Sequence, residues 1–147
     1  MATLGDYMAP VDGGTWYGCN KSITYAAGTT GAASAKTIFT VTGLVRMRIF
    51  AKCTADLTSG GAATIAVGTA ITAAGLIAQT TATGIDAGEI WHDATPDASV
   101  ELETVSATKL VSQDVVETIG TTTVTGGSLQ YSVLWQPVSQ DGMVVAA

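Results

Sequence analysis

The sequence has few charged residues. Only 12% of its 147 residues are Asp, Glu, Lys or Arg, while 47% are apolar and the mean hydropathy is +0.37. Soluble globular proteins usually carry about twice that share of charge. A surface so poor in charge exposes contiguous apolar patches unless something covers them, so we expect burial against partners. The length fits one domain with one core.

Basic residues are scarcest, with six Lys and Arg against twelve Asp and Glu and a net charge of −6. A nucleic-acid binder needs a basic face, so this class is excluded. Thr, Gly and Asp interrupt every apolar run, so we expect no membrane-spanning helix, which needs about 18 or more apolar residues. Residues 1–12 lack the Lys or Arg and the apolar stretch of a signal peptide, which predicts synthesis in a cytoplasm.

Residues that carry chemistry are also rare. The two cysteines, Cys19 and Cys53, have no CxxC spacing, and we expect buried thiols that behave as small hydrophobic side chains. No Walker A, GxGxxG, GxSxG or HExxH pattern occurs, and the Gly-Thr-Thr-Gly stretch at 28–31 has no following Lys to meet a phosphate. We therefore expect no enzyme and no cofactor.

The one histidine, His92, is the sharpest catalytic hypothesis. It lies within residues 86–103, which hold half of the acidic residues, so a metal site or a general base is conceivable. However, His92 and Asp93 are adjacent and would point to opposite faces of a strand, and the Asp spacing of a calcium loop is absent. We favour a solvated surface loop at 93–97 and expect no metal or catalytic role.

The composition predicts strands, since Thr, Gly, Ala and Val are abundant and strong helix formers are scarce. The clearest strand covers 44–53, where apolar residues alternate with Arg46, Arg48, Phe50 and Lys52. The buried face should carry five residues: Val45, Met47, Ile49, Ala51 and Cys53.

Glycine-rich turns suggest two hairpins. One joins 44–53 to 63–68 through 58–61, and the other joins 115–124 to 129–135 through Gly126 and Gly127. Further strands are expected at 37–42, 76–81 and 99–105. Some seven or eight short strands predict an all-β, antiparallel β-sandwich or a jelly-roll or barrel-like single domain. A helix over 62–78 is the alternative for that Ala-rich stretch.

Residues 1–22 differ from the rest, because glycines alternate there with Tyr7, Trp16 and Tyr17. We expect an extended N-terminal arm, followed by a single β domain at 23–147. Such an arm either docks on a neighbouring subunit or closes one end of its own sandwich.

Three of the six basic residues, Arg46, Arg48 and Lys52, share one face of the strand predicted at 44–53. This is either a solvated sheet face or a contact with an acidic surface, for example residues 86–103 of another copy. The candidate interface residues are thus Arg46, Arg48, Lys52, Tyr7, Trp16 and Tyr17.

The Thr/Gly/Ala-rich strands of 39–68, the segment 90–97 and the ending 131–142 with Trp135-Gln136-Pro137 resemble head decoration proteins of tailed bacteriophages. The resemblance implies a β-sandwich or barrel-like protein on the outside of an icosahedral head, commonly a homotrimer that clamps adjacent major capsid proteins. It implies localisation in the virion after synthesis in the host cytoplasm. A tail or adaptor component is an alternative within the same class.

Two alternatives come from other classes. A carbohydrate-binding adhesion module could use the rings of Tyr7, Trp16, Tyr17 and Trp91 as stacking faces. A metal-dependent hydrolase would be centred on His92.

Overall fold

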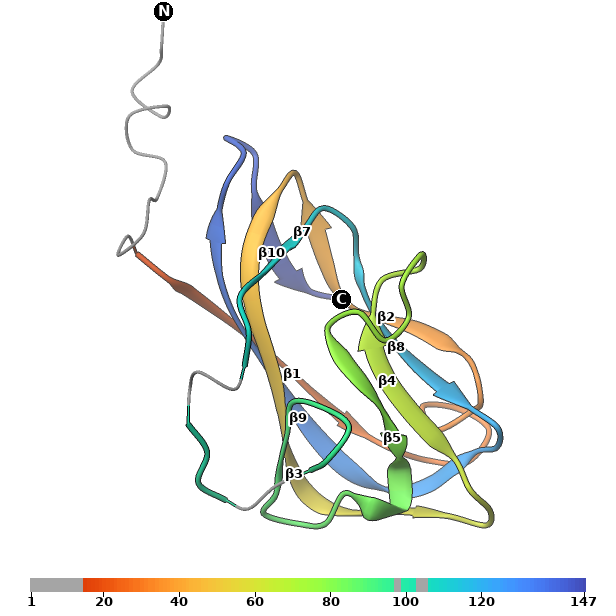
Figure 1. The fold of residues 1–147 in the computed structure, drawn as a ribbon. Helices are drawn as coiled ribbons and strands as arrows, with labels where there is room; N and C mark the ends of the chain where they lie inside the picture. The colour runs from red at the N-terminus through yellow and green to blue at the C-terminus, as the bar shows by residue number, and fades with distance from the viewer. Residues whose placement is uncertain (1–14, 97–98, 103–105) are drawn as a thin grey trace, which may run out of the picture.

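The chain folds as a sandwich of two antiparallel five-stranded sheets in a computed structural model that describes residues 15–96, 99–102 and 106–147 (Figure 1). The predicted all-β sandwich is confirmed. The strands are β1 (Tyr17–Thr24), β2 (Ala35–Thr42), β3 (Val45–Ser59), β4 (Thr64–Gly68), β5 (Ile77–Thr81), β6 (Ile90–Trp91), β7 (Lys109–Val111), β8 (Val115–Gly120), β9 (Val124–Pro137) and β10 (Met143–Ala146). One 3-10 turn, η1 (Ala82–Gly84), follows β5. No helix within the described ranges is long and apolar enough to cross a bilayer.

The two long strands β3 and β9 pair along most of their length and form the middle of the first sheet, here called sheet 1, in the order β1-β9-β3-β6. The short β7 pairs with the start of β3, on the same edge as β6. The second sheet, sheet 2, has the order β10-β2-β8-β4-β5. The core lies between the two sheets.

The alternation predicted for 44–53 is confirmed in β3. Val45, Met47, Ile49, Ala51 and Cys53 are buried, and the residues between them are half-buried or exposed. β9 shows the same pattern, with its buried residues facing those of β3 across the register. The predicted strands at 37–42 and 76–81 are also present, and 62–78 contains β4 in place of a helix.

Both predicted hairpins are wrong. β3 lies in sheet 1 and β4 in sheet 2, so the turn after Ser59 carries the chain across the sandwich. β8 and β9 are likewise in different sheets, and Gly126 and Gly127 lie inside β9, where Gly127 takes a φ of +98° beside a register shift. A period of two residues shows which face of a strand is buried but not which strand lies beside it.

The strand predicted at 99–105 is absent over 99–102, and 103–105 lie outside the described residues. Residues 99–102 form an irregular loop, in which Val100 and Leu102 are exposed. Cys53 is buried, Cys19 is half-buried, and both are free thiols. Burial raises the pKa of the Cys53 thiol to about 11.

The last residues of the predicted arm at 1–22 form part of a strand of the sandwich. Residues 1–14 lie outside the described part, but Tyr17–Thr24 forms β1, which pairs with β9 at every position from Tyr17 opposite Trp135 to Thr24 opposite Ser128. β1 is therefore an edge strand of the chain's own sheet 1.

Candidate interaction surface

The outward face of sheet 1 brings together three predicted interface residues: Trp16, Arg46 and Arg48. Arg46 lies opposite Gln136 on one side and Leu110 on the other. The guanidinium carbons of Arg46 and Arg48 lie 5.7 and 5.4 Å from the centroid of the Trp16 ring. Both distances are within the range of a cation–π contact, which contributes about 0.5–1 kcal/mol at an exposed site.

Hydrogen bonds hold both guanidinium groups in place. Arg46 Nε donates to Gln136 Oε1 at 2.6 Å, and Arg48 Nε donates to Thr108 Oγ1 at 2.9 Å. Each group thus has a ring contact and a polar contact. These contacts fix the orientation of both guanidinium groups, so the two side chains keep little rotamer freedom.

The other predicted interface residues lie elsewhere. Lys52 is exposed on the same face, opposite Gln130 and Ile90, about 13 Å along β3 from Arg48 at the usual rise of a strand. Tyr17 points to the inner side, where its ring lies 4.9 Å from that of Trp135. Tyr7 lies outside the described residues. The predicted interface residues therefore do not share one face of sheet 1. Trp16, Arg46, Arg48 and Lys52 lie on the outward face, whereas Tyr17 lies on the inner side.

An apolar groove of about 210 Å³ lies next to Arg48 on this outward face. Its wall is formed by side chains from β3, β9, β6 and the loop before β7, with Leu102 72% exposed at its rim. The lining residues are Arg48, Phe50, Ile90, His92, Glu101, Leu102, Ser106 and Leu134. The sequence pattern did not predict this groove, because the alternation at 99–105 predicted a strand there.

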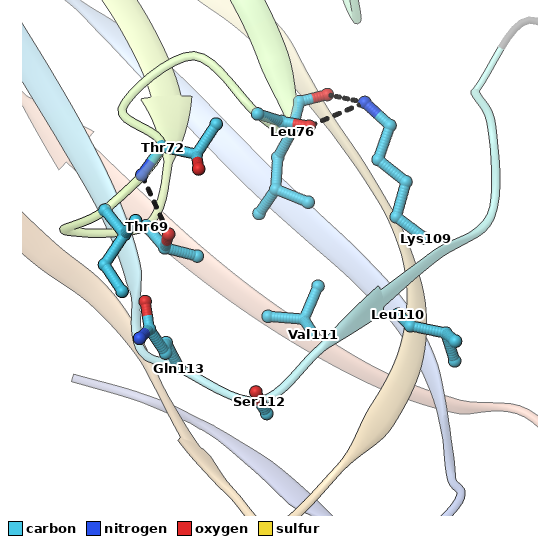
Figure 2. A pocket seen from close by; sticks show the side chains of 10 residues that line it. Thr69, Thr72, Leu76, Lys109, Leu110, Val111, Ser112 and Gln113 are labelled. Carbon is cyan, nitrogen blue, oxygen red and sulfur yellow. Dashed lines mark hydrogen bonds between the residues drawn. The ribbon is translucent and has the colours of Figure 1, made fainter.

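A second, wider pocket of about 360 Å³ opens between the loop after β4 and strand β7 (Figure 2). The Lys109 ammonium group donates to the backbone oxygens of Gly75 and Leu76 at 2.8 and 3.1 Å, which ties β7 to that loop. Ile71 and Leu110 line this pocket and are 79% and 68% exposed.

Large apolar side chains are exposed on several parts of the surface. They are Tyr17, Ile71, Val100, Leu102, Leu110, Val138, Met143 and Val145. Single exposed apolar residues are normal, but Leu110 and Leu102 lie beside the arginine pair and the groove, where cationic and apolar surface are continuous. We call this surface, formed by Trp16, Arg46, Arg48, Leu110 and the groove, the sheet 1 face.

The surface loop predicted at 93–97 is present over 93–96, but His92 just before it is not solvated. Its ring is almost fully buried after β6, with Nδ1 3.5 Å from Asp93 Oδ2 and Nε2 3.9 Å from Glu101 Oε2. The exposed turn begins one residue later, where the backbone N–H of Thr95 donates to Asp93 Oδ1 at 2.7 Å. Within the described ranges, no group of three or more His, Cys, Asp or Glu side chains is arranged to hold a metal ion.

Of the predicted stacking residues, Trp16, Tyr17 and Trp91 are described, and they offer little open surface for a sugar. The Trp91 side chain is fully buried between the sheets, and the two guanidinium groups lie over the Trp16 ring. Tyr17 is half exposed, with its ring packed against Trp135.

No family model and no curated protein matches this chain. Two solved structures are similar in fold. A chain of the cyanophage Pam1 capsid asymmetric unit is 19% identical, with 82% of this chain and 84% of that chain covered and a TM-score of 0.43. A chain of the acidic stable capsid structure of Helicobacter pylori bacteriophage KHP30 is 11% identical, with 88% and 92% covered and a TM-score of 0.45. Both likenesses concern the fold alone.

Proposed function

We propose that this chain is a non-enzymatic structural protein of a bacteriophage virion, which attaches to the major capsid protein on the outer surface of the head and stabilises the shell. The observation that carries the proposal is the sheet 1 face, where two cations of fixed orientation adjoin exposed apolar surface on a chain of net charge −6. The sequence resemblance to head decoration proteins supports the proposal that the protein binds a bacteriophage head.

The mechanism is mechanical. A protein that binds the assembled lattice more tightly than free capsid subunits shifts the equilibrium toward the lattice by mass action. Apolar contact area supplies affinity, while Arg46 and Arg48 set orientation against acidic groups on the partner. No bond is made or broken, so the proposal requires no catalytic group and no cofactor.

Self-association is part of the proposal. The exposed apolar side chains favour a closed homo-oligomer, because a closed interface uses up its own apolar surface, whereas an open one makes fibres. We choose a trimer because icosahedral lattices present threefold junctions, and we include the N-terminal segment before β1 among the contacts.

Light scattering coupled to size exclusion tests the oligomer. The expected mass is three times the 14.8 kDa of one chain at micromolar concentration. A variant that lacks residues 1–14 keeps Trp16 and β1, so we expect it to fold but to assemble and attach to heads less well. A monomeric mass for the full chain would contradict the trimer, and unchanged assembly and attachment of the shortened chain would remove the N-terminal segment from the contacts.

Attachment to purified heads lacking this protein tests the function and the charged residues together. Replacing Arg46, Arg48 and Lys52 with Gln should weaken attachment about 10-fold or more and flatten its dependence on salt, because three cations that meet acidic groups are lost. Replacing both arginines with Lys is the matched control, since it keeps the charge but loses the planar group and its contacts.

The control separates charge from local structure. If charge acts at the contact, the Lys variant keeps the salt dependence that the Gln variant loses, while unfolding in urea shows that both remain folded. Equal attachment by all three proteins would leave the arginines with a structural role only. Attachment to purified tails and not to heads would contradict the proposed location.

A further inference from the structure

Glu117 lies between the two sheets and is fully buried, although nothing in the sequence pattern singled it out. It points from β8 toward sheet 1, where two tyrosine hydroxyl groups meet one of its oxygens. Tyr25 and Tyr131 both donate to Glu117 Oε2, at 2.5 and 2.6 Å, and their own oxygens lie 3.5 Å apart. The other oxygen, Oε1, is buried without a hydrogen-bond partner.

Among the described residues, the charged groups that face this cluster do not pair with an ionised Glu117. Lys21, opposite Tyr131 on β1, donates to the backbone oxygen of Ala147. Lys36 lies directly opposite on β2, but its ammonium group donates to the backbone oxygens of Thr30 and Ala32 at 2.7 and 3.0 Å. The Cys53 thiol faces the cluster from β3, and burial raises its pKa to about 11, so it stays uncharged at neutral pH. β4, the other neighbour of β8, carries no titratable side chain.

The hydrogen bonds of Glu117 and its burial act in opposite directions on its two forms. Both tyrosine hydroxyl groups donate to Oε2, and these two short hydrogen bonds stabilise an ionised carboxylate, while the tyrosine oxygens are 3.5 Å apart and make at most a weak contact with each other. An ionised Glu117, however, buries a full charge between the sheets with Oε1 unpartnered, while the Lys36 ammonium group is bonded to backbone oxygens instead. The cost of that buried charge favours the neutral acid.

We propose that the Tyr25–Glu117–Tyr131 cluster is a proton-controlled switch in the stability of the sandwich. With Glu117 protonated, the cluster joins β8 of sheet 2 to β9 of sheet 1 and to the segment after β1. When Glu117 loses its proton, the end of the sandwich closed by that segment loosens.

The physical causes that shift the pKa of each group in the cluster follow from this geometry. Burial raises the pKa of Glu117, and the hydrogen bonds from Tyr131 and Tyr25 and the charge of Lys36 only partly oppose this effect. The pKa values of Tyr25 and Tyr131 are raised well above 10, chiefly by burial, so both remain protonated donors throughout. A glutamate in the unfolded chain titrates near its ordinary value of about 4.3.

The sign of the pH dependence follows. Since the pKa of Glu117 is higher in the folded than in the unfolded chain, its contribution to stability is fully present below about pH 4.3 and is lost as pH rises through the folded pKa. Between the unfolded and the folded pKa of Glu117, the folding equilibrium constant falls by up to about tenfold per pH unit. An acid stabilised by an ion pair would show the opposite trend.

Urea unfolding from pH 4 to pH 9 tests the switch with three proteins. Glu117→Gln keeps the shape of the neutral acid and cannot ionise, so the ratio of its folding equilibrium constant to that of the natural chain should rise with pH up to the folded pKa and then stay level. Glu89→Gln is the control, because Glu89 accepts a hydrogen bond from the backbone N–H of Asp86 in an exposed turn. We expect the ratio of the folding equilibrium constant of Glu89→Gln to that of the natural chain not to rise with pH.

Nuclear magnetic resonance of the natural chain gives a second measurement that needs no variant. The chain contains four glutamates, and with carbon-13 at the side-chain carboxyl, we expect one resonance to titrate above the others and to disappear in Glu117→Gln. Four glutamates that all titrate near their ordinary pKa would overturn the proposal, as would a Glu117→Gln ratio that does not change with pH.

Discussion

Replacing Trp91 with Ala is expected to lower the free energy of unfolding by about 3–5 kcal/mol, the usual cost of removing a large aromatic side chain from a core. Trp91 is fully buried, although β6 has only two residues, and its ring centroid lies 6.4 Å from that of Tyr131. It lies opposite Ala51 of β3, whose small side chain leaves room for the indole. The substitution opens a cavity between the sheets that backbone pairing cannot fill.

Trp16→Ala is the matched control, since it removes the same side chain from the outward face of sheet 1. Trp16 is half-buried and contacts Arg46 and Arg48, so we expect a loss of about 1 kcal/mol. Urea unfolding followed by circular dichroism compares the two variants without relying on tryptophan fluorescence. Similar losses for both would contradict the assignment of Trp91 to the core and of Trp16 to the surface.

Replacing Gly31 with Ala is expected to cost about 3 kcal/mol or more, because the added methyl group collides with backbone that cannot move aside. A Cβ atom at Gly31 would lie 1.8 Å from the backbone oxygen of Val124. The same pair is held by a hydrogen bond from the Val124 N–H to the Gly31 oxygen at 2.9 Å. Either that bond breaks or the segment after β1 moves away from the start of β9.

Gly18→Ala gives the control for this substitution. Gly18 lies in β1, and a Cβ atom there would meet nothing within 4 Å, so we expect a change of less than about 1 kcal/mol, with stabilisation favoured. The measurement is again the free energy of unfolding. A Gly31→Ala protein as stable as Gly18→Ala would show that the contact between Gly31 and Val124 is loose.

Strand alternation was readable from the sequence because it depends on local geometry. Successive side chains of a strand point to opposite faces, so β3 separates its apolar residues from Arg46, Arg48 and Lys52 whatever its neighbours are. That rule also placed Arg46 and Arg48 on one face. It said nothing about Trp16, which reaches the arginines only because β1 pairs with β9 in a particular register.

Strand pairing was not readable, and the hairpins failed for that reason. Glycines after Ser59 and at Gly126 predict a change of direction or a bulge, yet they do not state whether the chain returns within one sheet or crosses to the other. Crossing is decided by which arrangement covers both apolar faces. That is a property of the whole sandwich.

The sequence by itself determined the all-β class, the faces of the long strands and the shortage of charge, because each depends on composition or on a spacing of two residues. Tertiary structure alone decided the sheet order, the burial of His92, the stacking of Trp16 with two arginines and the enclosure of Glu117 by Tyr25 and Tyr131. In the last of these, Tyr25 and Glu117 lie 92 positions apart in the chain. Contacts of that separation form only when the two sheets pack, since the free energy that holds them comes from closing the core.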